Sequence, residues 1–141
     1  MAVKEILWDR YASNTGAFDL IAEGWNELVQ EGATPDRLGI CPVTANCQVL
    51  YAISEEGDVV GFIAYEEHEV FATAVEILSY VEPSSRRRGV YRALLEDMQR
   101  RMKKKGIGRL TSAVPASCKD MLATKRALGG KATSQTFDHE L

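Results

Sequence analysis

A polar loop between an apolar strand and an amphipathic helix decides the fold of this chain, and it reads Val81-Glu82-Pro83-Ser84-Ser85-Arg86-Arg87-Arg88-Gly89-Val90-Tyr91. Pro83 ends the strand, because proline has no N–H to donate to a ladder. Backbone N–H groups at the start of the next helix have no partner within that helix, and the helix dipole adds positive potential there. Gly89 lets a ligand approach the backbone closely, and arginines add charge-assisted hydrogen bonds. Together these features predict a cradle for a pyrophosphate.

The plain alternative is that Arg86, Arg87 and Arg88 only form a solvated loop, as charge runs usually do. The order of strand, loop, glycine and amphipathic helix favours the cradle. In the helix that follows, one face is apolar and cations occupy the last turn, where they complement the helix dipole. The apolar face comprises Val90, Leu94, Leu95, Met98 and Met102.

Strands and helices alternate on both sides of this loop. The sequence predicts strands at residues 3–8, 48–54, 59–66, 74–81, 110–114 and 132–137, the last at a sheet edge. It predicts helices from Asn14 or Thr15 to Gly32, from 34–36, from 90 to 105 and over 119–128. The expected fold class is α/β (α+β): a mixed, largely antiparallel sheet with helices on both faces.

Length and composition indicate one soluble domain spanning residues 1–141. The net charge of −3 argues against nucleic acid as a partner. No segment is apolar enough for a signal peptide or a membrane span, so we expect a cytoplasmic protein. Three cysteines without a C-x-x-C spacing predict free thiols and no metal site.

The pattern V-x-P-x-x-R-x-x-G-V, which leads into Ala93-Leu94-Leu95, resembles motif A of the GNAT acetyltransferases, Q/R-x-x-G-x-G/A. Arg86 takes the Q/R place and Gly89 the glycine place. Tyr91 departs from the pattern, because glycine or alanine is usual there. The resemblance is strong over residues 74–105, moderate over 48–130 and weak over the first forty residues.

This resemblance implies an N-acetyltransferase that moves an acetyl group from acetyl-CoA to a primary amine of a small molecule or protein, with both substrates bound. Residues 86–91 would hold the cofactor phosphates: Arg86, Arg87, Arg88, Gly89, Val90 and Tyr91. Backbone groups of Tyr80 and Val81 would contact the pantetheine arm where their strand splays from strand 110–114. The plain alternative is that Tyr80 and Val81 are ordinary core residues.

Catalysis needs a base, because an amine with a pKa near ~10.4 is almost fully protonated at pH 7. Glu76 is the first candidate, since an acidic residue early in this strand serves as base in some relatives. Strict alternation along the strand turns the Glu76 side chain away from the site, whereas a bulge in the strand turns it back. The other candidates, at the preceding strand end, are Glu66, Glu67, His68 and Glu69, and any of these acids is otherwise a solvated strand-end charge.

Many relatives protonate the departing thiolate with a tyrosine that follows an asparagine by seven residues. Alignment on Leu128 and Gly129 places Cys118 at the asparagine position and Lys125 at the tyrosine position, so the family acid is missing. Tyr91, Ser117 or Cys118 can substitute. The plain alternatives make Tyr91 a packing residue and Cys118 a buried thiol.

Two other functions remain open at this point. The missing tyrosine and the short C-terminus favour a catalytically weak or inactive GNAT-fold protein that binds acetyl-CoA or a protein partner. A nucleic-acid patch of Arg86–Arg88 and residues 100–105 is disfavoured, because no aromatic residue interleaves the cations. Only eleven residues follow Gly130, which leaves the acceptor pocket open or completed by a second subunit of a homodimer.

Overall fold

The elements of the computed structural model follow the predicted order closely. The structure describes residues 3–10, 15–31, 41–114, 118–135, 137 and 139. It contains β1 (Val3–Arg10), α1 (Thr15–Gln30), β2 (Gln48–Ser54), β3 (Val59–His68), the 3-10 turn η1 (Glu69–Phe71), β4 (Thr73–Val81), the 3-10 turn η2 (Pro83–Ser85), α2 (Val90–Lys104), β5 (Arg109–Ser112) and α3 (Lys119–Ala127). The helix predicted from residues 34–36 lies outside the described residues.

These strands form one sheet in the order β1-β2-β3-β4-β5. The first three pairings are antiparallel, and β4 pairs with β5 in parallel. The parallel pair is connected through α2, as a parallel connection requires a crossover. The predicted mixed, largely antiparallel sheet is therefore confirmed.

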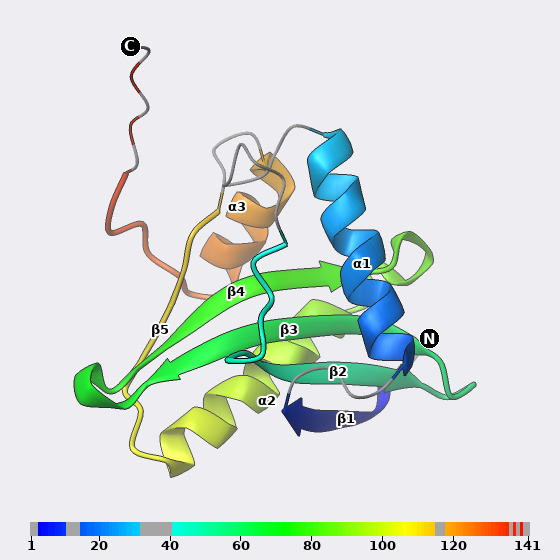
Figure 1. Ribbon diagram of the computed structural model, residues 1–141, viewed down its shortest axis with the longest axis horizontal. Coiled ribbons are helices and arrows are strands. Elements are labelled where there is room, and N and C mark those ends of the chain that lie inside the picture. Colours follow the sequence, from blue (N-terminus) through cyan, green and yellow to red (C-terminus); the bar gives the residue numbers. More distant parts are fainter. Residues whose placement is uncertain are drawn as a thin grey trace.

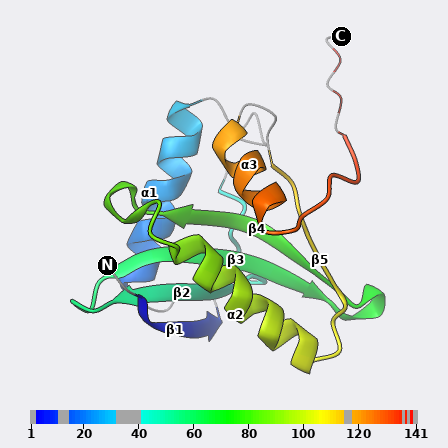
Figure 2. The ribbon, with the colours of Figure 1, turned by 180° about the vertical axis from the view of Figure 1, so that it is seen from behind.

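Helices cover both faces of the sheet, as predicted. In Figure 1, α1 crosses the front of the sheet, and Figure 2 shows α2 and α3 on the back. Each face has its own apolar core. The core under α1 contains Ala17, Leu20, Ile21 and Trp25 with Phe62 and Leu78, among others. The core under α2 contains Leu94, Leu95, Met98 and Met102 with Leu50 and Ile63, among others.

A bulge in β4 changes the direction in which its side chains point. Ala64 pairs with Leu78 and the next residue, Tyr65, pairs with Glu76, so Ile77 is an extra residue. Side chains alternate between faces along a regular strand, so Glu76 and Leu78 would otherwise share a face. Leu78 instead packs in the core under α1, whereas Glu76 hydrogen-bonds to a residue of α2.

The parallel pairing of β4 with β5 stops early. Its last pair is Glu76 with Ser112, while β4 continues for five more residues to Val81, still paired with β3. Residues 77–81 therefore have no strand partner on the β5 side among the described residues. The predicted splay between these two strands is present.

The predicted last strand, residues 132–137, is wrong for the part that the structure describes. Residues 131–135 are exposed and form no strand, and Phe137 is 74% exposed. Residues 131–135 lead away from the sheet and helices in Figure 1. The reason is that this segment, K-A-T-S-Q, has no apolar alternation to bury, and a strand needs a packed face to be stable in water.

The contact between α1 and β4 predicts the effect of a methyl group at Gly24. A Cβ atom there would lie 2.7 Å from Cγ and 2.9 Å from Cβ of Tyr80. Alanine in a helix is normally favoured over glycine by about 1 kcal/mol, but overpacking costs about 1–3 kcal/mol. We therefore expect Gly24→Ala to lower the free energy of unfolding, measured by urea denaturation. A rise in stability would contradict this packing, and the loss should shrink in a Tyr80→Ala background.

Candidate functional site

The loop between β4 and α2 has a conformation that exposes its backbone. Arg87 has φ = 61° and Gly89 has φ = 77°, both in the left-handed region. A Cβ atom added at Gly89 would meet nothing within 4 Å. Glycine is thus favoured by the backbone conformation there, and the space above it is open to a ligand.

Unpaired amide groups surround Gly89. It caps the N-terminus of α2, and the first carbonyl to accept an intrahelical bond is its own, from the N–H of Ala93 at 3.0 Å. The N–H groups of residues 90–92 therefore have no carbonyl within the helix to bind. The side chains of Arg87 and Arg88 are exposed beside them. Positive potential and free N–H groups at one helix end are suited to a phosphate group.

The side chain of Arg86 is engaged within the protein. Its Nε donates to the Val81 carbonyl at 2.9 Å, and its Nη2 donates to both carboxylate oxygens of Glu27, at 3.1 and 3.0 Å. The guanidinium also lies over the Tyr80 ring, 5.1 Å from its centre. Arg86 therefore ties the loop to α1, while Arg87 and Arg88 make no ion pair with the part of the chain that the structure describes.

Glu27 is a member of this cluster that the sequence reasoning missed. A hydrogen bond from the Tyr80 hydroxyl and the Arg86 guanidinium hold the pKa of Glu27 below its usual value, against the effect of burial. The available signal was the i, i+4 spacing of Glu23 and Glu27, which places both carboxylates on one side of α1.

A cavity of about 110 Å³ lies where β4 and β5 separate. We call it the splay cavity. It is bordered by residues from both faces of the sheet, so it passes through the sheet at the splay. Its described lining comprises Trp25 and Leu28 of α1, Pro42, residues 76–79 of β4, Ala113 and Val114 after β5, and Cys118 and Met121 at the start of α3.

Glu76, Tyr91 and Lys125 form a buried cluster at the edge of this cavity. The Tyr91 hydroxyl donates to Oε1 of Glu76 at 2.7 Å, and the Lys125 ammonium donates to Oε2 at 2.7 Å. Lys125 also hydrogen-bonds to the Tyr91 hydroxyl. Glu76 and Tyr91 are each only 8% exposed. The cluster joins β4, α2 and α3 beside the splay cavity.

This cluster determines the direction of the Tyr91 side chain. Burial, and then the Glu76 carboxylate, raise the pKa of Tyr91 far above its ordinary value, so the phenol stays protonated and donates to Glu76. The ring therefore lies in the core under α2 and does not crowd the loop at residues 86–89. A raised pKa also makes Tyr91 a weaker proton donor than an ordinary tyrosine.

Lys125 was aligned with the family tyrosine, but its contact with Glu76 was not foreseen. Its ammonium neutralises the one carboxylate among the described residues that line the splay cavity. The two residues are 49 positions apart, so no local spacing signals the pair.

The other candidate bases lie outside the splay cavity. Glu67 forms an ion pair with Lys105 at 2.7 Å, and Glu66 lies 3.5 Å from His68. Neither Glu66, Glu67, His68 nor Glu69 is among the described residues that line it. Cys118 does line it, at the N-terminus of α3, and Ser117 lies outside the described residues.

The described residues contain neither a metal-binding cluster nor a membrane-spanning helix. The described part of the chain has no cluster of three or more His, Cys, Asp or Glu residues that would hold a metal ion. Within the same residues, no helix has the length and apolar character needed to cross a bilayer.

The architecture of the chain is similar to that of several solved acetyltransferases. The chain matches an aminoglycoside acetyltransferase, HMB0005, from an uncultured soil metagenomic sample with a TM-score of 0.73 at 19% identity, over 100% of this chain and 99% of that one. It matches the ribosomal-protein-alanine N-acetyltransferase of Brucella melitensis biovar Abortus 2308 with a TM-score of 0.70 at 17% identity, over 99% and 100%. It matches AAC(6')-Iy in complex with a CoA-linked bisubstrate analogue with a TM-score of 0.71 at 18% identity, over 97% of this chain and 97% of that one.

At these identities the structures show a shared fold and nothing finer. No curated protein matches the sequence. The sequence profile of the acetyltransferase (GNAT) family, however, matches residues 3–122, which is most of the chain. Because this match spans more than half of the sequence, the chain belongs to the acetyltransferase (GNAT) family.

Proposed function

We propose that this protein is an acetyl-CoA-dependent N-acetyltransferase that acts on a primary amine of a small molecule or protein. One observation carries the proposal: the exposed backbone loop around Gly89 lies at the end of the same strand whose separation from β5 opens the splay cavity. A ligand with a diphosphate at one end and a thin arm at the other requires such an arrangement. Solved structures of relatives in complex with CoA support this assignment.

In this proposal the backbone of the loop binds the phosphates together with Arg87 and Arg88. We assign the diphosphate to the N–H groups of residues 89–91 and to the side chains of Arg87 and Arg88. Arg86 contributes indirectly, because its guanidinium is bonded to Glu27 and Val81 and holds the loop in place. Main-chain groups of Tyr80 and Val81, on the unpaired side of β4, are assigned to the pantetheine arm.

Acetyl transfer replaces the C–S bond of the thioester with a C–N bond, and the proton lost by the amine balances the proton gained by the CoA sulfur. Glu76 is the proposed base, because it is the carboxylate that borders the splay cavity. Hydrogen bonds from Tyr91 and Lys125 hold its carboxylate in place. Cys118 is the proposed proton donor to the sulfur, since it lines the same cavity and the Tyr91 hydroxyl is committed to Glu76.

A weak or inactive acetyl-CoA-binding protein is the second candidate, and the pairing of Glu76 with Lys125 favours it. The Tyr91 hydroxyl and the Lys125 ammonium already occupy the two carboxylate oxygens of Glu76, each at 2.7 Å. Release of free thiol from acetyl-CoA in the presence of a panel of amines separates the two candidates. Binding of acetyl-CoA without turnover on any amine would support the second.

The loop assignment predicts a loss of affinity for acetyl-CoA when Arg87 and Arg88 are both replaced with alanine. Each charge-assisted hydrogen bond contributes about 1.5–3 kcal/mol, so we expect the Kd measured by calorimetry to rise at least tenfold. The matched control is Lys103→Ala with Lys104→Ala, which removes the same charge from the exposed far end of α2. Equal Kd changes in the two double variants would reject the assignment.

The base assignment predicts a large effect of Glu76→Gln on kcat with little effect on acetyl-CoA binding. Glutamine keeps the shape of the side chain but cannot take a proton, and general base catalysis contributes about 10²–10⁴-fold. Turnover is measured by thiol release at saturating acetyl-CoA, with thermal melts to verify folding. Glu66→Gln, at the end of β3, serves as the matched control and should retain the wild-type kcat.

A second variant guards against misfolding, because Glu76→Gln leaves the Lys125 ammonium buried without its partner. Glu76→Gln combined with Lys125→Met removes both charges and should recover stability without recovering turnover. If the double variant regains the wild-type kcat, Glu76 is not the base.

A further inference from the structure

A second cavity, of about 250 Å³, adjoins the splay cavity on the α1 side of the sheet. It lies between α1 and the chain segment before β2, and we call it the α1 groove. Its described lining is apolar apart from Asn26, and comprises Phe18, Ile21, Ala22, Trp25, Cys41 and Val43. No carboxylate or cation is among the lining residues that the structure describes.

The α1 groove and the splay cavity share a wall. Trp25, 6% exposed, borders both of them. Pro42 borders the splay cavity, while its two chain neighbours, Cys41 and Val43, border the α1 groove. The two spaces are therefore adjacent at two separate points of the chain, one on α1 and one on the segment before β2.

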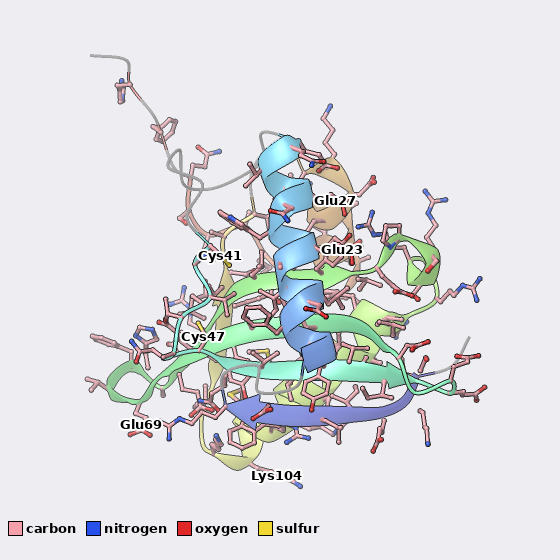
Figure 3. All side chains as sticks on the ribbon, turned by 45° about the vertical axis from the view of Figure 1, so that its right-hand side comes forward. Glu23, Glu27, Cys41, Cys47, Glu69 and Lys104 are labelled. Atoms are coloured by element: carbon pink, nitrogen blue, oxygen red, sulfur yellow. The ribbon has the colours of Figure 1, made fainter. Side chains whose placement is uncertain are left out.

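Glu23 and Glu27 of α1 face away from this groove. In Figure 3, Cys41 lies on one side of α1 and Glu23 and Glu27 lie on the other. Both carboxylates are already engaged: Glu27 with Arg86 and Tyr80, and Glu23 with the Tyr80 hydroxyl at 3.4 Å. They belong to the contact between α1 and the phosphate loop and are not part of the groove.

We propose that the α1 groove binds the body of the acceptor, and that the acceptor is a primary amine on an uncharged apolar group, such as an arylalkylamine. The inference rests on the proposed function, because the amine must reach a thioester in the splay cavity and its remaining atoms must occupy an adjoining space. Burial of an apolar body on these side chains is favourable. A polycationic acceptor would lose hydration there and would meet no carboxylate among the described lining residues.

Matched amines test the preference directly. 2-Phenylethylamine and ethanolamine carry the same primary amine on two carbons and differ in a phenyl or a hydroxyl group. Burial of the ring predicts a kcat/KM at least about tenfold higher for 2-phenylethylamine, measured by thiol release from acetyl-CoA. Spermidine, as a polycation, should be poorer than 2-phenylethylamine. Equal values for all three amines would overturn the proposal.

A substitution that fills the α1 groove tests whether the aryl group of the acceptor binds there. Ala22→Phe places a ring in the α1 groove from a position that does not itself line the splay cavity. We expect the KM for 2-phenylethylamine to rise about tenfold, with the KM for ethanolamine and the Kd of acetyl-CoA unchanged. The control is Gln30→Phe, an exposed position of the same helix that does not line either cavity. Equal KM values in the two variants would place the acceptor elsewhere.

A binding measurement separates the failure of this inference from the failure of the proposed function. The chain has two tryptophans, so a Trp8→Phe background reports Trp25 fluorescence alone. 2-Phenylethylamine should change this fluorescence, and Ala22→Phe should weaken the response. A response without turnover on any amine would reject the proposed function and keep the groove. Turnover without a response, and without preference for the aryl amine, would reject the groove and keep the function.

Discussion

The parallel pairing of β4 with β5 ends at Glu76 and Ser112, and the site depends on that ending. Past this point β4 is held by β3 on one side only, so its other edge offers backbone groups that no described strand satisfies. Buried backbone groups need partners, and an extended ligand can supply them. The splay cavity opens at the same place, and the strand then leads directly into the loop around Gly89.

The bulge at Ile77 lies at the same point, and it changes the face of the sheet toward which the side chains before it point. Without it, Glu76 would share a face with Leu78 and point into the core under α1. With it, Glu76 points toward α2 and α3 and meets Tyr91 and Lys125. A buried ion pair adds little net stability, but the loss of either member leaves an uncompensated charge. The Glu76–Lys125 pair therefore fixes α3 against β4 at the point where the pairing of β4 with β5 ends.

Arg86 links the two halves of the site. It stands in the motif at a position that predicts a phosphate contact, yet its guanidinium binds Glu27 of α1 and lies over Tyr80. The same helix provides Trp25 and Leu28 to the splay cavity and most of the apolar wall of the α1 groove. The ion pair of Arg86 with Glu27 thus couples the position of α1 to the loop, so the proposed donor and acceptor surfaces share this contact.

Most of the architecture can be predicted from the sequence, because periodicity, the positions of proline and glycine and the Arg86–Tyr91 motif are local signals. The predicted bounds of β2 and the predicted starts of α2 and α3 agree with the structure to the residue. The last strand was predicted wrongly, because its sequence has strand propensity at a few positions but no apolar face to pack. Three features follow from packing alone: the bulge at Ile77, the pairing of Glu76 with Lys125 and the ion pair of Arg86 with Glu27. The bulge depends on strand register, and the two pairs join residues 49 and 59 positions apart. No local sequence pattern contains register or contacts over such separations.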